Sequence, residues 1–117
     1  MKFLCVCEGG NVRSVALASI LKMHGQQDAI AASARWNSVD TLTMLWQWAD
    51  HVIVMAAEIF ALLPPELSRQ TKVSLVDVGP DVYGAAFHPA LQGMLVPIVQ
   101  SWQARQWDLH APETERA

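Results

Sequence analysis

The pattern of apolar positions along this chain alternates between the pattern of a strand and the pattern of a helix. Short runs of β-branched, apolar or small residues predict strands, and apolar positions that recur every three or four residues predict helices. The predicted strands are residues 2–6, 29–33, 51–55 and 72–77. The predicted helices are residues 14–23, 39–50, 56–63 and a long helix that begins at Pro89.

Local signals fix several of these boundaries. Ser38 is a typical N-cap, and Pro64 and Pro65 end the short helix that precedes them. Pro89 suits the first turn of the last helix, and Pro97 is expected to kink that helix. The apolar stripe predicted for the last helix is Leu91, Leu95, Ile98 and Trp102.

Strands that alternate with helices predict right-handed crossovers and a parallel sheet with helices on both faces. We expect one domain over residues 1–107, and a disordered tail over residues 108–117 because this segment has no pattern. Ligands bind at the carboxyl ends of the strands in such sheets, and the first strand–helix loop, residues 7–14, lies at that edge.

Charge and composition exclude several classes of function. The eight Lys and Arg residues are scattered and outnumbered by eleven Asp and Glu residues, giving a net charge of −3, so nucleic acid is not an expected partner. The apolar run at the amino terminus is too short for a signal peptide, and charges and prolines interrupt every other apolar run. We therefore expect a cytoplasmic protein with no membrane contact.

Cysteine and histidine positions give no sign of a disulfide or a metal site. Cys5 and Cys7 are two residues apart on the first predicted strand, which is the far limit of unstrained disulfide geometry. The histidines lie far apart, and none is paired at ligand spacing with a cysteine or a carboxylate. They are His24, His51, His88 and His110. We expect neither a metal ion nor another cofactor.

The first loop carries the candidate chemistry. Cys7 ends a strand and Arg13, six positions later, starts a helix. The intervening backbone can curl so that its N–H groups form an anion nest, for which we expect Gly9 and Gly10 to supply positive φ values. The helix dipole and the guanidinium both favour a thiolate, and a guanidinium can grip two phosphoryl oxygens. The predicted phosphate-binding residues are Glu8, Gly9, Gly10, Asn11, Val12, Arg13 and Ser14.

A structural interpretation of the same two residues stays open at this point. Cys7 could be a buried structural cysteine, and Arg13 could start a helix while pairing with a nearby carboxylate. The strand-to-helix context favours the phosphate-binding interpretation.

With this Cys-x5-Arg-Ser loop directly after the first strand, the sequence resembles the low-molecular-weight protein tyrosine phosphatases. Residues 32–34 are similar to the end of that family's second strand, residues 49–55 are similar to its third strand, and residues 77–83 are similar to its late acid loop. The spacing from Ser33 to Asp50 is much shorter than in the full-length family, and in this the chain resembles the compact, predicted-phosphatase branch. The resemblance implies a flavodoxin-like, three-layer α/β/α fold with a four-stranded parallel sheet.

The resemblance also implies a mechanism and its residues. Cys7 would be the nucleophile, Arg13 the phosphate clamp, and Ser14 a hydrogen-bond partner of the thiolate. Asp81 matches the family's general acid, with Asp77 in reserve. A turn aspartate after proline is the structural alternative for Asp81.

Two aromatic residues complete the expected site. Trp36 and Tyr83 lie on the loops that flank the site in the family and could wall a pocket, although ordinary packing would also explain them. The implied substrate is a phosphorylated protein or a small aryl phosphate, with inorganic phosphate as product, and the chain could be a monomer or a homodimer.

The chain departs from the family at three places. Gly10 stands where the family has an asparagine, and Asn11 follows one position later. Glu8 brings a carboxylate beside the thiolate, and a like charge opposes phosphate binding. Val82 replaces the proline that follows the family's general acid.

Three rival functions stay open. The departures favour a degenerate module that would bind phosphate without turnover, and the other two rivals belong to relatives that share the fold. A thiol-dependent arsenate reductase would need an outside thiol, since no cysteine follows Cys7. A phosphocysteine carrier is less favoured, because Arg13 followed by Ser14 favours hydrolysis over storage.

Overall fold

Four parallel strands form the centre of the molecule, which we describe from a computed structural model covering residues 1–109. The strands are β1 (Lys2–Cys7), β2 (Asp28–Ser33), β3 (His51–Val54) and β4 (Val73–Leu75). They lie in the order β2-β1-β3-β4, and every neighbouring pair is parallel. The predicted four-stranded parallel sheet is therefore confirmed.

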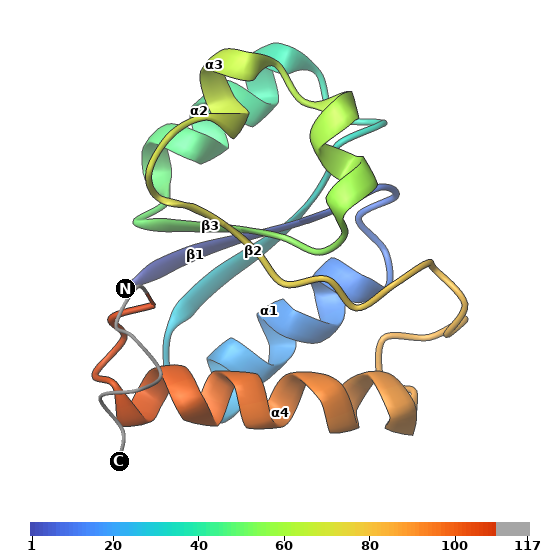
Figure 1. Cartoon of the computed structure of the whole chain (residues 1–117), viewed down its shortest axis with the longest axis vertical. Helices are drawn as coiled ribbons and strands as arrows, with labels where there is room; N and C mark the ends of the chain where they lie inside the picture. The colour runs from blue at the N-terminus through green and yellow to red at the C-terminus, as the bar shows by residue number, and fades with distance from the viewer. Residues whose placement is uncertain (110–117) are drawn as a thin grey trace.

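Helices cover both faces of this sheet (Figure 1). One face carries α1 (Arg13–Met23) and α4 (Pro89–Ala104). The other carries α2 (Val39–Trp48), the 3-10 helix η1 (Ala57–Leu62) and the short helix α3 (Pro65–Ser68). The three-layer α/β/α arrangement predicted from the sequence is thus present.

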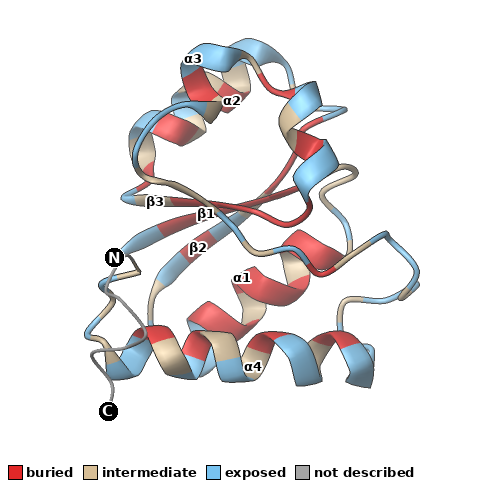
Figure 2. Cartoon of the chain, viewed as in Figure 1, coloured by how far each residue is buried: buried red, intermediate tan, exposed pale blue. Residues whose placement is uncertain are grey.

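The core explains why the first strand reads as a continuous apolar run. A strand with helices on both sides buries both sets of its side chains. Residues 3–6 of β1 are fully buried, and the buried positions of β3 lie beside them (Figure 2). Burial at both faces holds β1 in the interior of the sheet. The position of its last residue is thereby fixed as well.

Strand order sets the position of the first loop. The chain leaves β1 for β2 on one side and later returns to place β3 on the other side of β1. Such a reversal is the point at which open α/β sheets bind ligands, outside the carboxyl ends of the strands. The loop after β1 lies at this edge, together with the segment 76–88 that joins β4 to α4 (Figure 1).

Several local expectations differ in detail from the structure. The predicted helix over 56–63 is a 3-10 helix, and Pro65, which was expected to end it, opens α3 instead because proline suits a first helical turn. The buried stripe of α4 includes Val99, whereas Ile98 is only partly buried. The helix continues through Pro97, which is exposed.

The last described residues pack against the rest of the protein, although their sequence shows no helix or strand pattern. The Asp108 N–H donates to the Arg105 carbonyl at 3.2 Å, and Trp107 and Leu109 pack against the core. The remainder of the predicted tail, residues 110–117, lies outside the described residues.

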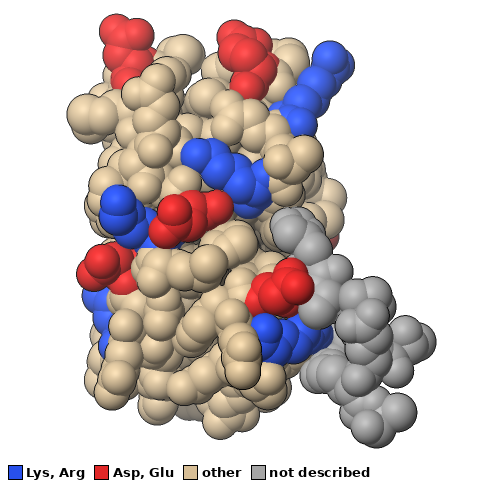
Figure 3. All heavy atoms as spheres, turned by 90° about the vertical axis from the view of Figure 1, so that its left-hand side faces the viewer, with Lys and Arg blue, Asp and Glu red and all other residues tan. Residues whose placement is uncertain are grey.

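The side of the molecule opposite the first loop carries charges of both signs. Figure 3 shows acidic and basic side chains interspersed over the described part of this face, with neither sign forming a stripe. Among the described residues, no helix is both long and apolar enough to cross a membrane.

Trp46 joins α2 to α3 through the core. Its side chain is 1% exposed, and its indole N–H donates to the Leu67 carbonyl at 3.0 Å. We predict that Trp46→Phe lowers the free energy of unfolding by about 1–3 kcal/mol, because the smaller ring leaves a cavity in the core and the Leu67 carbonyl, which also accepts from the Gln70 N–H at 3.3 Å, loses the shorter of these two hydrogen bonds. Urea unfolding measures this change. Trp36→Phe is the control, since Trp36 is 75% exposed and its replacement should change stability by less than about 0.5 kcal/mol. Equal effects of the two substitutions would contradict this account.

Candidate active site

The loop after β1 brings the predicted nucleophile and its predicted partner into contact. Cys7 is the last residue of β1 and is 2% exposed. Its sulfur is hydrogen-bonded to the Ser14 hydroxyl at 3.0 Å, and the Gly10 N–H donates to the same sulfur at 3.2 Å. The end of β1 thus holds two polar hydrogen-bonding groups against the Cys7 sulfur.

Gly10 allows the loop to curl in this way. Its φ is +72°, and a Cβ at this position would lie 3.0 Å from the backbone nitrogen of Ser33. Glycine is therefore required both by the left-handed conformation and by the close approach to the end of β2. The expectation that Gly9 also has a positive φ is wrong, because the curl is concentrated at one residue.

Arg13 is the most unusual side chain of the site because it is charged and almost wholly buried. It is 3% exposed, and its Nη1 donates to the Gly79 carbonyl at 2.9 Å. Its Nε is buried and has no partner within the described residues, and no carboxylate of those residues pairs with the guanidinium. The structural alternative, in which Arg13 pairs with a nearby acid, therefore does not hold for the described residues.

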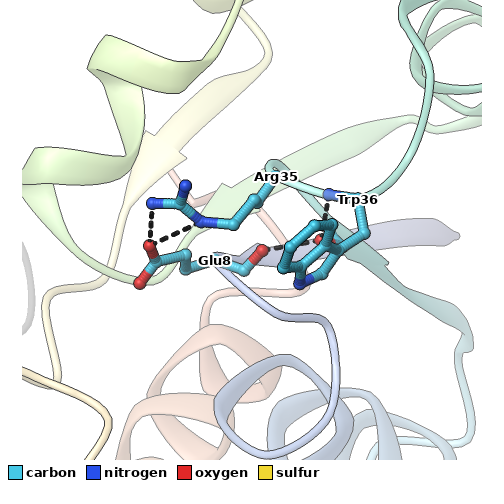
Figure 4. A network of polar contacts seen from close by, with 4 residues as sticks. Glu8, Arg35 and Trp36 are labelled. Atoms are coloured by element: carbon cyan, nitrogen blue, oxygen red, sulfur yellow. Dashed lines mark hydrogen bonds and ion pairs between the residues drawn. The ribbon is translucent and has the colours of Figure 1, made fainter.

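Hydrogen bonds of Ser33 tie the first loop to the segment after β2, and Figure 4 shows Glu8 and Trp36, the two residues that its hydroxyl joins. The Ser33 hydroxyl donates to the Glu8 carbonyl at 2.6 Å and accepts from the Trp36 N–H at 2.8 Å. The Ser33 N–H donates to the Asn37 side-chain oxygen at 2.7 Å. A nest needs its N–H groups turned inward, and holding the Glu8 carbonyl on the outside favours that orientation.

Arg35 neutralises the carboxylate that the sequence places beside Cys7. The Arg35 Nε donates to Glu8 Oε1 at 2.9 Å, and Arg35 Nη2 binds the same oxygen (Figure 4). Both side chains are about half exposed, at 46% and 43%, so solvent also screens this pair. Sequence reasoning missed Arg35, although an arginine just beyond the end of β2, the neighbour of β1, was an available signal.

The loop that resembles the family's acid loop, residues 77–83 and here named the late loop, contains two aspartates in different surroundings. The Asp77 carboxylate accepts from the Gly79 N–H at 2.8 Å and from the Ala57 N–H at 3.4 Å, so it organises the turn. Asp81 is exposed, and its carboxylate accepts no hydrogen bond from the described residues. Of the two, Asp81 is the carboxylate left available for chemistry.

The backbone around Asp81 is closed by a bond that proline could not make. The Val82 N–H donates to the Pro80 carbonyl at 2.9 Å, which is the i to i+2 pattern of a γ-turn centred on Asp81. The Tyr83 hydroxyl donates to the Val78 carbonyl at 2.8 Å and closes the late loop on itself. These bonds restrict the loop where the family uses a proline.

The two candidate pocket residues differ in exposure. Trp36 is largely exposed, whereas the Tyr83 ring is partly buried and lies edge-on to His88 at 5.8 Å between centroids. No enclosed pocket is present in the described part of the chain.

Cys5 differs from Cys7 although the two share a strand. Burial raises the pKa of the Cys5 thiol well above its usual range, the neighbouring Cys7 adds to this increase, and Lys22 opposes it. Cys5 therefore stays protonated at neutral pH and acts as a small apolar core residue. The described residues contain no group of three His, Cys, Asp or Glu side chains that could hold a metal ion.

Comparisons with known proteins agree with this architecture. No protein-family model and no curated protein matches the sequence. Solved structures do match, and they include Wzb from Vibrio vulnificus in complex with benzylphosphonate. That structure is 19% identical with a TM-score of 0.65, and the match covers 89% of this chain and 97% of that one.

Two further structures show the range of activities on this fold. The tyrosine phosphatase Wzb from Escherichia coli K30, in complex with phosphate, is 17% identical with a TM-score of 0.65 and coverages of 89% and 96%. The YwlE arginine phosphatase from Geobacillus stearothermophilus is 17% identical with a TM-score of 0.62 and coverages of 96% and 99%. The chain therefore has the fold of the low-molecular-weight protein tyrosine phosphatases, as its first loop predicted.

The contrast between the two loop glycines gives a test of the local geometry. Gly10→Ala should lower the free energy of unfolding by about 1–2 kcal/mol from the left-handed φ alone, and by more because of the contact with Ser33. Gly9→Ala should change it by less than about 0.5 kcal/mol, since the added Cβ meets only the Asn11 side chain at 4.0 Å. Urea unfolding of both variants provides the measurement, and a larger loss for Gly9→Ala would show that the curl is placed at the wrong residue.

Proposed function

We propose that this chain is a cysteine-dependent phosphomonoester hydrolase that acts on phosphotyrosine in proteins through a phosphocysteine formed on Cys7. The observation that carries this proposal is the buried guanidinium of Arg13, which lies in the same loop as the Cys7 sulfur and has no carboxylate partner among the described residues. A buried charge without a counter-ion is costly, and a bound anion removes that cost.

The free donors of Arg13 fit a phosphoryl group. Nη1 is engaged by the Gly79 carbonyl, which leaves Nε and Nη2 on the other edge of the planar guanidinium. Those two N–H groups are parallel and match two oxygens of one phosphoryl group. An anion held there would lie against the loop backbone, whose N–H groups and helix terminus add to its binding.

The proposed reaction has two steps. The Cys7 thiolate attacks phosphorus, the sulfur–phosphorus bond forms as the bond to the phenol oxygen breaks, and Asp81 gives its proton to that oxygen. A water molecule then attacks the phosphocysteine, Asp81 takes its proton, and inorganic phosphate leaves as the Cys7 thiolate is restored. Arg13 and the loop N–H groups stabilise the charge on the equatorial oxygens in both steps.

Aromatic side chains beside the loop favour an aromatic leaving group. The exposed Trp36 and the partly buried Tyr83 belong to the segments that flank the site in the family. A phosphotyrosine ring would pack against such side chains. A thiolate mechanism also suits the reducing cytoplasm, where we place the protein.

Turnover of para-nitrophenyl phosphate between about pH 5 and 8, the usual range of acid–base catalysis, tests the mechanism. We expect Cys7→Ala to abolish turnover and Asp81→Asn to lower kcat by about 100-fold or more. Alanine is preferred to serine because a YwlE mutant has been solved with a phosphorylated active-site serine. Turnover that survives Cys7→Ala would rule out the proposed nucleophile, and phosphate binding without turnover would identify a phosphate-binding module.

A substrate panel then separates the related activities. Because one structural neighbour is an arginine phosphatase, the panel contains phosphotyrosine and phosphoarginine peptides. Arsenate with an external thiol tests the reductase alternative, for which consumption of the thiol is the readout. We expect phosphotyrosine to have the highest kcat/KM, and a higher value for phosphoarginine would overturn the proposed specificity.

The Glu8–Arg35 pair predicts an electrostatic effect on anion binding. Arg35→Ala leaves the Glu8 carboxylate without its counter-ion beside the loop, so inorganic phosphate should inhibit about two- to fivefold more weakly. Adding Glu8→Gln should restore inhibition, and salt should reduce the difference by screening. Inhibition constants at low and high ionic strength measure both effects. Failure of Glu8→Gln to restore inhibition would assign the loss to something other than charge.

A further inference from the structure

We propose that Gly79 is a positioning residue for the reaction, because its carbonyl, held by the phosphate-binding arginine, aligns the late loop so that Asp81 can protonate the leaving group. This inference rests on the proposed function. It assigns the Arg13 guanidinium a second role, in which one edge binds the phosphoryl group and the other holds the loop that carries the acid.

Both sides of the Gly79 residue are engaged in the structure. Its carbonyl accepts from Arg13 Nη1 at 2.9 Å, which links residues 66 positions apart in the chain. Its N–H donates to the Asp77 carboxylate at 2.8 Å. The orientation of this residue is therefore set by the phosphate-binding loop and by the start of the late loop together.

Gly79 is also the last point at which the backbone of the late loop is held before Asp81. The Val78 N–H donates to the Met55 carbonyl at 3.1 Å, and the Val78 side chain is buried. Beyond Gly79, the residues Pro80, Asp81 and Val82 are all exposed. The γ-turn at Asp81 fixes the shape of this exposed segment, so the direction in which it leaves Gly79 decides where the carboxylate points.

The need for glycine at this position is conformational rather than steric. Its φ is +79°, and a Cβ built there meets no atom within 4 Å. Alanine would fit the space but strain the left-handed backbone, and relief of the strain turns the carbonyl away from Arg13. Asparagine tolerates the left-handed conformation better than alanine and keeps the carbonyl in place.

Two substrates with different leaving groups test the proposal. We expect Gly79→Ala to lower kcat/KM for phosphotyrosine by about tenfold, a part of the 100- to 10,000-fold that general acid–base catalysis contributes. The loss for para-nitrophenyl phosphate should be smaller, because its more acidic phenol departs with less help from an acid. Inhibition by inorganic phosphate should weaken much less than kcat/KM falls, because Arg13 loses its bond to Gly79 but keeps the Nε and Nη2 edge that would bind the phosphoryl group. Gly79→Asn should recover most of the activity.

Gly84→Ala is the matched control. Gly84 lies just beyond the late loop with a φ of +73° and nothing within 4 Å of a built Cβ, but it makes no hydrogen bond with the described residues. The same strain there should leave the ratio of the two kcat/KM values unchanged. In an Asp81→Asn background, Gly79→Ala should have no further effect on that ratio, because the two residues act on one step.

The possible outcomes separate the positioning role of Gly79 from the proposed function. If the wild type turns over both substrates and Gly79→Ala behaves like Gly84→Ala, the positioning role is wrong while the proposed function stands. If Gly79→Ala weakens phosphate inhibition as much as it lowers kcat/KM, Gly79 serves the anion site and the acid-positioning role is again wrong. A wild type without turnover would overturn both the proposed function and this role.

Discussion

The guanidinium of Arg13 is almost wholly removed from solvent, and no carboxylate of the described residues neutralises it. Most buried arginines are paired with an acid, because the penalty for desolvating a charge exceeds what one neutral hydrogen bond returns. In this protein the hydrogen bond from Arg13 Nη1 to the Gly79 carbonyl therefore compensates only part of the desolvation penalty. This unpaired buried charge is the observation on which the proposed anion site rests.

The rest of the fold supplies what this charge requires. Burial of β1 on both faces fixes the point at which the strand ends, and Cys7 stands at that point. The end of β2 holds the first loop through Ser33, and Arg35 pairs with the Glu8 carboxylate beside that loop. The loop, the neighbouring strand and the late loop thus converge on one place at the carboxyl edge of the sheet.

The alternation of strands and helices was predictable because strands of a parallel sheet covered on both faces are continuous apolar runs, and the helices between them are amphipathic. The loop from Cys7 to Ser14 was predictable because a cysteine, glycines and an arginine at that spacing have few structural uses. Glycine conformations were less predictable, since neighbouring glycines look alike in sequence and only the contact with Ser33 shows that Gly10 makes the turn. Arg35 was missed because its partner, Glu8, is distant in the chain and the pairing depends on how β1 and β2 lie side by side.

The position of Cys5 has a consequence for how this protein would respond to oxidants. The sequence contains only two cysteines, and both are on β1 two residues apart, so a disulfide between them lies at the limit of allowed geometry. If a peroxide converts Cys7 to a sulfenic acid, the other thiol of this sequence, the buried Cys5, is poorly placed to resolve it. Recovery would then depend on thiols supplied from outside, and further oxidation to the sulfinic acid would be irreversible. The redox state of the surroundings would thus set how long a single oxidation event lasts.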